Sequence, residues 1–277
     1  MAASSEQKNQ KLIEAASKTD AEVFASMEFE SIAEFMIKID FRVKSNKDLS
    51  EEMRNLFSVG YKNEVGSRRA SFRVFQHVGI PIILVEDDLV TEGENKENDM
   101  IISYKELVKK EIMKICKEVL DVLQQKLIPN IRKLVSSDNE MTSAHKEARI
   151  FYTKMVGDYY RYLAEVDSEL KNAKKADKYY TQGSNLAEDH LKPTHPIRLA
   201  LALNHSVCYF EILKNQKKAC EIAKKAFDEA IAQLDKLEES HYKDSTLVMQ
   251  LLRDNVNLWT IRVEDEANGK EKVDEEK

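Results

Sequence analysis

Apolar and polar residues alternate with the helical period along most of the chain. Ser50 followed by two acids is an N-cap signal, and Pro196 suits the first turn of a helix. Two shorter apolar stripes predict two short helices within 22–45. The longer predicted helices are near 50–76, 100–128, 147–168, 171–191, 196–213, 217–236 and 244–261. We count about nine helices and no convincing sheet, which predicts an all-α fold.

Two segments interrupt this pattern. Residues 79–98 begin with the β-like run GIPIILVEDDLV and end as a polar loop, so we predict a long connection there. We expect the helix at 100–128 to stop at Pro129 and residues 130–146 to form at most a partial helix. The other connections are short, which indicates antiparallel neighbours. The inner face of the helix at 50–76 is predicted from these residues: Leu56, Val59, Val65, Phe72 and Phe75.

Composition supports long amphipathic helices. The 277 residues include only 7 Gly and 4 Pro, and 33% of them are charged. No apolar run is long enough for a membrane span, and no apolar stretch after the start resembles a secretory signal. The three cysteines have no metal-type spacing, so we expect buried thiols in a reducing compartment and a cytoplasmic protein.

The formal charge of −6 is unevenly distributed. Residues 263–277 contain seven acids and three lysines, which gives −4, and almost no apolar residues. We therefore expect a single domain over 1–262 followed by an acidic disordered tail at 263–277. The net acidity argues against nucleic-acid binding. Whether the tail competes for a basic groove stays open.

Two predicted helices carry basic residues at the same spacing. Lys62 and Arg69 are seven residues apart, as are Lys154 and Arg161, so each pair lies on one helical face. Tyr162 adds a phenol next to the second arginine. If the two faces meet, they form a cationic pocket suited to a phosphate. For either pair alone, a solvated helix face is the competing interpretation.

The pair Lys154 and Arg161 is difficult to place on a fully solvent-exposed surface. Lys154 and Arg161 lie within FYTKMVGDYYRYLAEV, where apolar and aromatic residues surround most of the helix. Asp158 is four residues after the lysine and three before the arginine, so it could orient both by ion pairing.

The last helices each present an apolar strip that contains one amide side chain, Asn204 or Asn255. An amide offers a donor and an acceptor and so fits the backbone of an extended peptide. Ordinary buried or capped asparagines remain the alternative. The accompanying residues are Leu203, Val207 and Glu211 on the first helix, and Leu251, Leu258 and Trp259 on the final one.

Four blocks of this sequence resemble the 14-3-3 family, in the right order and over about residues 50–261. The blocks are RNLFSVGYKNEVGSRRASFR (54–73), FYTKMVGDYYRYLAEV (151–166), PTHPIRLALALNHSVCYFEI (193–212) and YKDSTLVMQLLRDNVNLWT (242–260). The resemblance implies nine antiparallel helices that form a concave amphipathic groove, usually in a dimer. It also implies an adaptor that binds phosphoserine or phosphothreonine segments of client proteins in signalling, without enzymatic activity, cofactor or metal.

The resemblance assigns roles to the residues already singled out. Phosphate binding falls to Lys62, Arg69, Arg161 and Tyr162. Contacts to the client backbone fall to Lys154, Asn204 and Asn255. The groove wall is implied to consist of Leu203, Val207, Glu211, Leu251, Leu258 and Trp259.

The chain departs from the family at its dimer contacts and connections. Ser31 stands where the family commonly has an arginine, although the expected acidic partner Glu111 is present, and Leu107 replaces an expected cation. The connections at 79–98 and 130–146 are longer than the family norm. We expect the apolar run of the first to pack on its own domain, rather than on another protomer or a partner.

Ser71 lies in the basophilic-kinase pattern Arg68-Arg69-Ala70-Ser71. The resemblance places this serine at the dimer interface, where phosphorylation would oppose association. An inaccessible, unmodified serine is the alternative.

The sequence does not contain the motifs that would indicate another functional class. No Walker loop, zinc-type histidine pair or EF-hand loop is present, and His195 beside Pro196 is explained by helix capping. A 34-residue repeat, which a tetratricopeptide scaffold would need, is absent, as are a basic amphipathic face and a lipidation signal for membrane attachment.

The substitutions at Ser31 and Leu107 predict either weaker homodimerisation than in typical family members or a changed preference between homodimers and heterodimers. Partly exposed ion pairs contribute only about 0–1 kcal/mol each, so apolar contacts would still support some association. Light scattering across a dilution series measures the effect. An undiminished dimer at nanomolar concentration would contradict the prediction.

Overall fold

The computed structural model describes residues 44, 47–77, 92–134, 141–167 and 170–274, apart from the side chains of 75–77, 92–99 and 261–274. It comprises two compact units, Met1–Glu140 and Met141–Lys277, each of which is described by itself. The described residues form eight α-helices and no strand, which confirms the all-α fold class. The helices expected within 22–45 and the run GIPIILVEDDLV lie outside the described residues.

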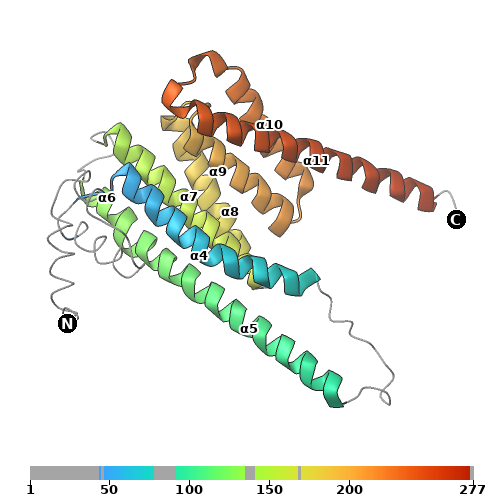
Figure 1. Cartoon of the computed structure of the whole chain (residues 1–277). Coiled ribbons are helices and arrows are strands. Elements are labelled where there is room, and N and C mark those ends of the chain that lie inside the picture. Colours follow the sequence, from blue (N-terminus) through green and yellow to red (C-terminus); the bar gives the residue numbers. More distant parts are fainter. Residues whose placement is uncertain (1–43, 45–46, 78–91, 135–140, 168–169, 275–277) are drawn as a thin grey trace, which may run out of the picture. The chain divides into compact units, whose positions relative to one another are not determined.

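The first unit contains two long helices, α4 (Glu51–His77) and α5 (Glu92–Asp121), which run antiparallel along one another (Figure 1). Ser50 Oγ accepts a hydrogen bond from the Met53 N–H at 3.3 Å, which confirms the predicted N-cap. Val59 was predicted on the inner face but is 52% exposed. It lies half a helical turn away from the buried residues, which are Met53, Phe57, Tyr61, Val65 and Phe72.

The helix at 100–128 differs from its prediction at both ends. α5 begins at Glu92, so residues 92–98 belong to the helix and not to a connection. At its other end the chain continues through a π-helical turn, Val122–Leu127, into α6 (Ile128–Leu134). The expected stop at Pro129 is therefore wrong. Proline is the second residue of α6, directly after the π-helical turn, whose wider hydrogen-bond pattern accommodates a residue that has no N–H donor.

The second unit contains five helices. They are α7 (Ser143–Val166), α8 (Leu170–His190), α9 (Pro196–Val207), α10 (Gln216–Ile231) and α11 (Tyr242–Asp274). α7 packs along α8, while α9, α10 and α11 share a core that includes Leu199, Ala223 and Leu252. A π-helical turn, Cys208–Ile212, prolongs α9 to nearly its predicted end at 213. Two 3-10 turns, Leu234–Lys236 and Glu239–His241, lead into α11.

Side-chain caps set the starts of two of these helices. Thr142 accepts a hydrogen bond from the His145 N–H at 3.2 Å, so α7 begins four residues before the predicted 147. His195 Nδ1 accepts one from the Ile197 N–H at 3.2 Å and precedes Pro196, the first residue of α9. The capping role predicted for His195 is therefore confirmed.

The last helix, α11, extends to Asp274. The division into a single domain over 1–262 and an acidic disordered tail at 263–277 stays a prediction.

Candidate functional site

The buried carboxylate of Asp158 lies at the centre of a polar cluster in the second unit. Asp158 is 6% exposed, and its Oδ2 accepts a hydrogen bond from Lys154 Nζ at 2.8 Å. Both residues are on α7, four positions apart, where side chains of one helix face meet. The ion pair expected between them is confirmed.

Two other helices contribute donors to the same carboxylate. Tyr180 on α8 donates its hydroxyl to Asp158 Oδ1 at 2.6 Å, and Asn204 on α9 donates Nδ2 to that oxygen at 2.7 Å. One carboxylate thus holds α7, α8 and α9 together through side chains. The hydrogen bonds to a charged acceptor are each expected to contribute about 1.5–3 kcal/mol.

Arg161 reaches the cluster through a tyrosine instead of a direct pair with Asp158. Its Nε donates to Tyr180 Oη at 3.2 Å, and its Nη1 donates to Glu165 Oε1 at 3.3 Å. The guanidinium carbon lies 4.8 Å from the centre of the Tyr162 ring, a cation–π contact. The hydrogen bonds that Arg161 donates to Tyr180 and Glu165 therefore use Nε and Nη1.

Sequence reasoning did not find Tyr180. The signal was present: α8 buries a stripe of small residues, Ala173, Ala176, Gly183 and Ala187, with one tyrosine among them. A buried phenol among alanines needs a polar partner, which predicts a carboxylate on the facing helix. Which carboxylate it meets depends on how α7 and α8 pack.

Gly157 permits the approach of Tyr180. A Cβ added at Gly157 would lie 2.7 Å from Tyr180 Cδ1 and 2.8 Å from its Cε1. Real side chains do not come this close, so the tyrosine ring would have to move away from α7. The residue before Asp158 therefore determines whether the Tyr180 hydroxyl can reach the carboxylate.

The electrostatics of the cluster favour the ionised carboxylate. Burial by itself would raise the pKa of Asp158, but the charges of Lys154 and Arg161 and the hydrogen bonds from Lys154 and Tyr180 lower that pKa below its ordinary value. Burial raises the pKa of Tyr180 well above its ordinary value, an effect to which the Asp158 charge adds, so its phenol stays protonated and donates. The cluster supplies fixed charges and donors, not a nucleophile.

The two remaining basic residues of the predicted pocket are in the first unit. Lys62 is exposed and Arg69 is partly exposed on α4. Their spacing places them on one face of that helix. That this face meets the one carrying Arg161 and Tyr162 stays a prediction.

The predicted wall residues occupy different depths in the second unit. Leu203 and Val207 are half-buried against the core shared by α9, α10 and α11. On α11, Leu251 is 44% and Leu258 is 50% exposed, and Asn255 lies between them in the helical order, partly buried. Leu247, which the sequence analysis did not select, is four residues before Leu251 and extends the same exposed stripe.

Two residues predicted on the wall have other surroundings. Trp259 is only 3% exposed and stacks on Phe210, with ring centres 4.7 Å apart. It belongs to the core shared by α9, α10 and α11. Glu211 is exposed on the π-helical turn that follows α9.

The positions tied to modification and dimer contacts lie in the first unit. Ser71 is exposed on α4, and its hydroxyl donates to the Ser67 carbonyl at 3.2 Å. Glu111, whose expected partner was replaced by Ser31, accepts a hydrogen bond from Arg68 Nε of its own chain at 3.2 Å. Leu107 is 51% exposed on α5. Ser31 itself lies outside the described residues.

The described part of the chain contains no group of three or more His, Cys, Asp or Glu side chains that could hold a metal ion. None of its helices combines the length and the apolar character needed to cross a membrane.

Comparisons with known proteins agree with the resemblance. A model of the 14-3-3 protein family matches residues 10–260. The chain is 48% identical over 216 residues to 14-3-3 protein beta/alpha-A of Xenopus laevis, an alignment that covers 77% of this chain and 80% of the relative. It is 47% identical over 222 residues to 14-3-3 protein beta/alpha-B of the same organism, with 79% and 82% covered.

Replacing Gly157 by alanine is expected to destabilise the second unit, because the new methyl group displaces Tyr180. Overpacking of this kind costs about 1–3 kcal/mol. Chemical unfolding measures the loss. Gly60→Ala is the matched control: no atom lies within 4 Å of its added Cβ, so it should be neutral or slightly stabilising. Equal stabilities of the two variants would contradict this account.

The lowered pKa of Asp158 predicts a specific pH dependence. Its stabilising effect is complete above the ordinary value of 3.8 and is lost as the pH falls through the lower folded-state pKa. Asp158→Asn should therefore cost about 3 kcal/mol at neutral pH, and the cost should shrink in strong acid. Chemical unfolding of the variant and the unmodified protein, at neutral pH and in strong acid, measures the cost of the substitution. Asp228→Asn, which disrupts an exposed pair with Lys224, should change stability little at either pH.

Proposed function

Because the chain belongs to the 14-3-3 family, we propose that the phosphate of its clients is held by the residues that the basic spacing selects: Lys62, Arg69, Arg161 and Tyr162. Members of this family are adaptors that bind phosphoserine and phosphothreonine segments of client proteins and form dimers. The chain is accordingly a phosphorylation-dependent adaptor in signalling and not an enzyme.

The observation that carries the residue assignment is the environment of Arg161. Arg161 is 7% exposed, and its guanidinium is oriented by Tyr180, Glu165 and the Tyr162 ring. A preoriented guanidinium loses little conformational entropy when it binds an anion. Its planar donors match phosphate oxygens, and each charge-assisted hydrogen bond contributes about 1.5–3 kcal/mol.

The requirement for phosphorylation follows from charge. A phosphate adds about −1.5 to −2 charges at neutral pH, whereas a serine hydroxyl adds none. Lys154, Asp158, Arg161 and Glu165 together carry two positive and two negative charges. In our proposal, Lys62 and Arg69 supply the two further positive charges that a dianion needs.

We propose that Lys154, Asn204 and Asn255 bind the client backbone. The first two are held on the Asp158 carboxylate, so their remaining donors and acceptors have a defined direction. An extended peptide presents its own N–H and C=O groups regardless of its side chains. Contacts of this kind would position many different clients on one surface.

The apolar part of the groove is proposed to consist of the half-buried and exposed residues Leu203, Val207, Leu251 and Leu258. Exposed leucines along one helix face are typical of a surface that a partner covers. Trp259 would act by supporting this face from the core, and Glu211 by its charge at the edge.

Two assignments accompany this function. We propose a cytoplasmic location, supported by the thiols of Cys208 and Cys220, because reduced cysteines suit a reducing compartment. We also propose Ser71 as a regulatory phosphorylation site, because it is exposed on the monomer and follows two arginines. A phosphate there would oppose dimer formation if the serine lies in the interface.

Lys62→Glu is the most direct test of the proposed phosphate-binding residues. Lys62 is exposed, so the substitution should leave folding intact while it places a negative charge against the phosphate. Binding of a phosphoserine peptide, measured by calorimetry, should fall at least a hundredfold, which corresponds to about 2.7 kcal/mol. Arg161→Ala should also abolish binding, but it removes a buried cation and will destabilise the unit as well.

Lys117→Glu is the control for the change in charge, because Lys117 is exposed on α5 and is not one of the proposed phosphate-binding residues. This variant should bind the phosphopeptide like the unmodified protein. Equal affinity of the Lys62→Glu variant and the control, or equal affinity for phosphorylated and unphosphorylated peptide, would refute the assignment.

A further inference from the structure

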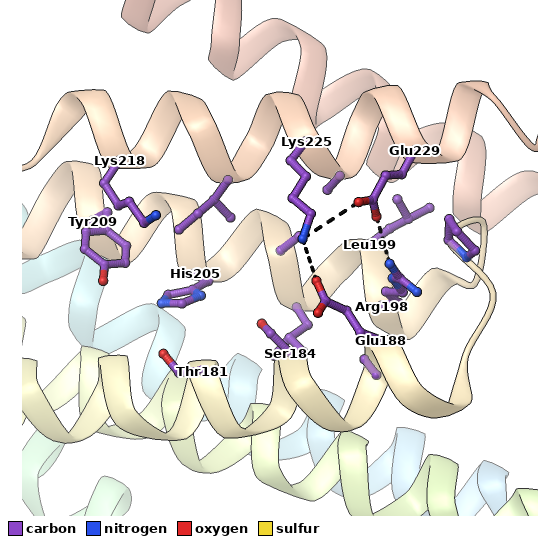
Figure 2. A pocket seen from close by; sticks show the side chains of 16 residues that line it. Thr181, Ser184, Glu188, Arg198, Leu199, His205, Tyr209, Lys218, Lys225 and Glu229 are labelled. Atoms are coloured by element: carbon purple, nitrogen blue, oxygen red, sulfur yellow. Dashed lines mark hydrogen bonds and ion pairs between the residues drawn. The ribbon is translucent and has the colours of Figure 1, made fainter.

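A cavity of about 280 Å³ lies between α8, α9 and α10 of the second unit (Figure 2). Each of these helices contributes an alanine to its walls: Ala187 from α8, Ala202 from α9 and Ala226 from α10. Larger side chains at these positions would occupy part of the space between the helices. None of the residues proposed to bind phosphate or peptide is among those that line the cavity.

The other apolar side chains that line the cavity are aliphatic as well. They are Pro193, Leu199, Leu201 and Ile222. The two rings of the lining, His205 and Tyr209, contact each other with their centres 5.1 Å apart. His205 also stacks on Tyr180 at 5.3 Å. These rings are already packed against protein, so the apolar surface offered to a ligand is mainly aliphatic.

The charged groups at one end of the cavity pair with one another. Arg198 Nη2 lies 2.7 Å from Glu229 Oε2. Lys225 Nζ lies 2.7 Å from Glu188 Oε1 and 3.8 Å from Glu229 Oε1. Figure 2 shows these ion pairs together at one end, away from His205 and Lys218. The two cations and two carboxylates of this end cancel.

The charged groups at the other end also have partners. Lys218 Nζ lies 3.4 Å from Glu221 Oε2, and both side chains are about half exposed to water. Asp177 Oδ1 lies 2.9 Å from His205 Nε2, and its carboxylate also accepts a hydrogen bond from Tyr209. Burial and this hydrogen bond raise the pKa of Tyr209 to about 12, so its phenol stays protonated.

The negative charge of Asp177 gives a cation little reason to enter. Burial lowers the pKa of His205 below its ordinary value, so the imidazole is neutral at pH 7 and does not cancel this charge. However, Asp177 is not part of the lining, and its side chain is 34% exposed to water. A ligand of either charge would lose its own hydration in the cavity and would compete with existing partners.

Two hydroxyls of α8 can bind the polar group of a neutral ligand. Thr181 and Ser184 are three residues apart on one helix face, and both line the cavity (Figure 2). The hydroxyl of Thr153 donates to the carbonyl of Arg149 on its own helix at 2.7 Å. In the described part of the chain, the hydroxyls of Thr181 and Ser184 form no such bond. Each can therefore donate to and accept from a ligand.

We propose that this cavity binds a small neutral aliphatic alcohol, with its hydroxyl toward Thr181 and Ser184 and its chain against Leu199 and Ile222. The paired charges disfavour an ion, and the aliphatic walls match a hydrocarbon chain. The volume is near the lower end of small-molecule sites, about 300 Å³, and admits a chain of several carbons but no folded peptide. Thr181 and Lys225 are exposed, so the cavity can be entered from solvent.

The experiment compares 1-hexanol with hexanoate and hexylammonium, two ions of the same chain length and opposite charge, on the full chain. The methyl resonance of Ile222 reports binding in the cavity, and its titration gives the affinity of each probe. We expect hexanol to shift this resonance and to bind at least tenfold more tightly than either ion. The proposal is overturned if hexanol causes no shift, or if either ion binds as tightly as hexanol.

Two variants test where the alcohol binds. Ala202→Leu fills part of the cavity and should abolish the shift that hexanol causes. Ala144→Leu is the matched control, because Ala144 is exposed in the first turn of α7 and does not line the cavity. This control should bind hexanol like the unmodified protein. Retained binding in Ala202→Leu, or its loss in the control, would contradict the assignment.

The hydroxyls are tested by combining Thr181→Val with Ser184→Ala, which keeps the shapes of the side chains similar. The affinity for hexanol should fall at least threefold, because the alcohol loses its hydrogen-bond partners. An unchanged affinity would refute the proposed orientation of the alcohol. None of these measurements uses a phosphopeptide, so a failed phosphate assignment would leave them unaffected.

Discussion

The second unit depends on one buried charge, the carboxylate of Asp158. Left alone, a buried carboxylate would cost several kcal/mol or take up a proton. Lys154, Tyr180 and Asn204 remove that cost by donating to its two oxygens from three different helices. The same bonds that satisfy the charge also orient the donors. In our proposal, the structural role and the binding role therefore depend on a single side chain.

Close packing makes this arrangement possible. The Tyr180 ring lies directly against the backbone of α7 at Gly157, where no side chain keeps the two helices apart. Its hydroxyl can then accept from Arg161 while it donates to Asp158. The arginine is thereby held rigid without a direct ion pair to the aspartate. A rigid cation recognises the geometry of phosphate better than a mobile one.

Much of the fold could be predicted from local pattern. The Ser50 cap, the start of α9 at Pro196 and the pairing of Lys154 with Asp158 each involve residues within four positions. The errors arose where packing overrides local preference. A π-helical turn carries the helix past Pro129, and Val59 faces solvent because the buried stripe of α4 runs through Phe57 and Tyr61. Trp259 has a sequence position beside the exposed Leu258 but is buried in the core.

The sequence by itself determined the helices, the family and which residues share a helical face, because the helical period is visible in the spacing of apolar and polar residues along the chain. Tertiary structure alone decided how Asp158 is satisfied. Tyr180 and Asn204 are 22 and 46 residues away from it in the chain, and no spacing rule connects them. The cavity at Lys218 is likewise formed by three helices whose mutual packing, and not their separate patterns, leaves space between them.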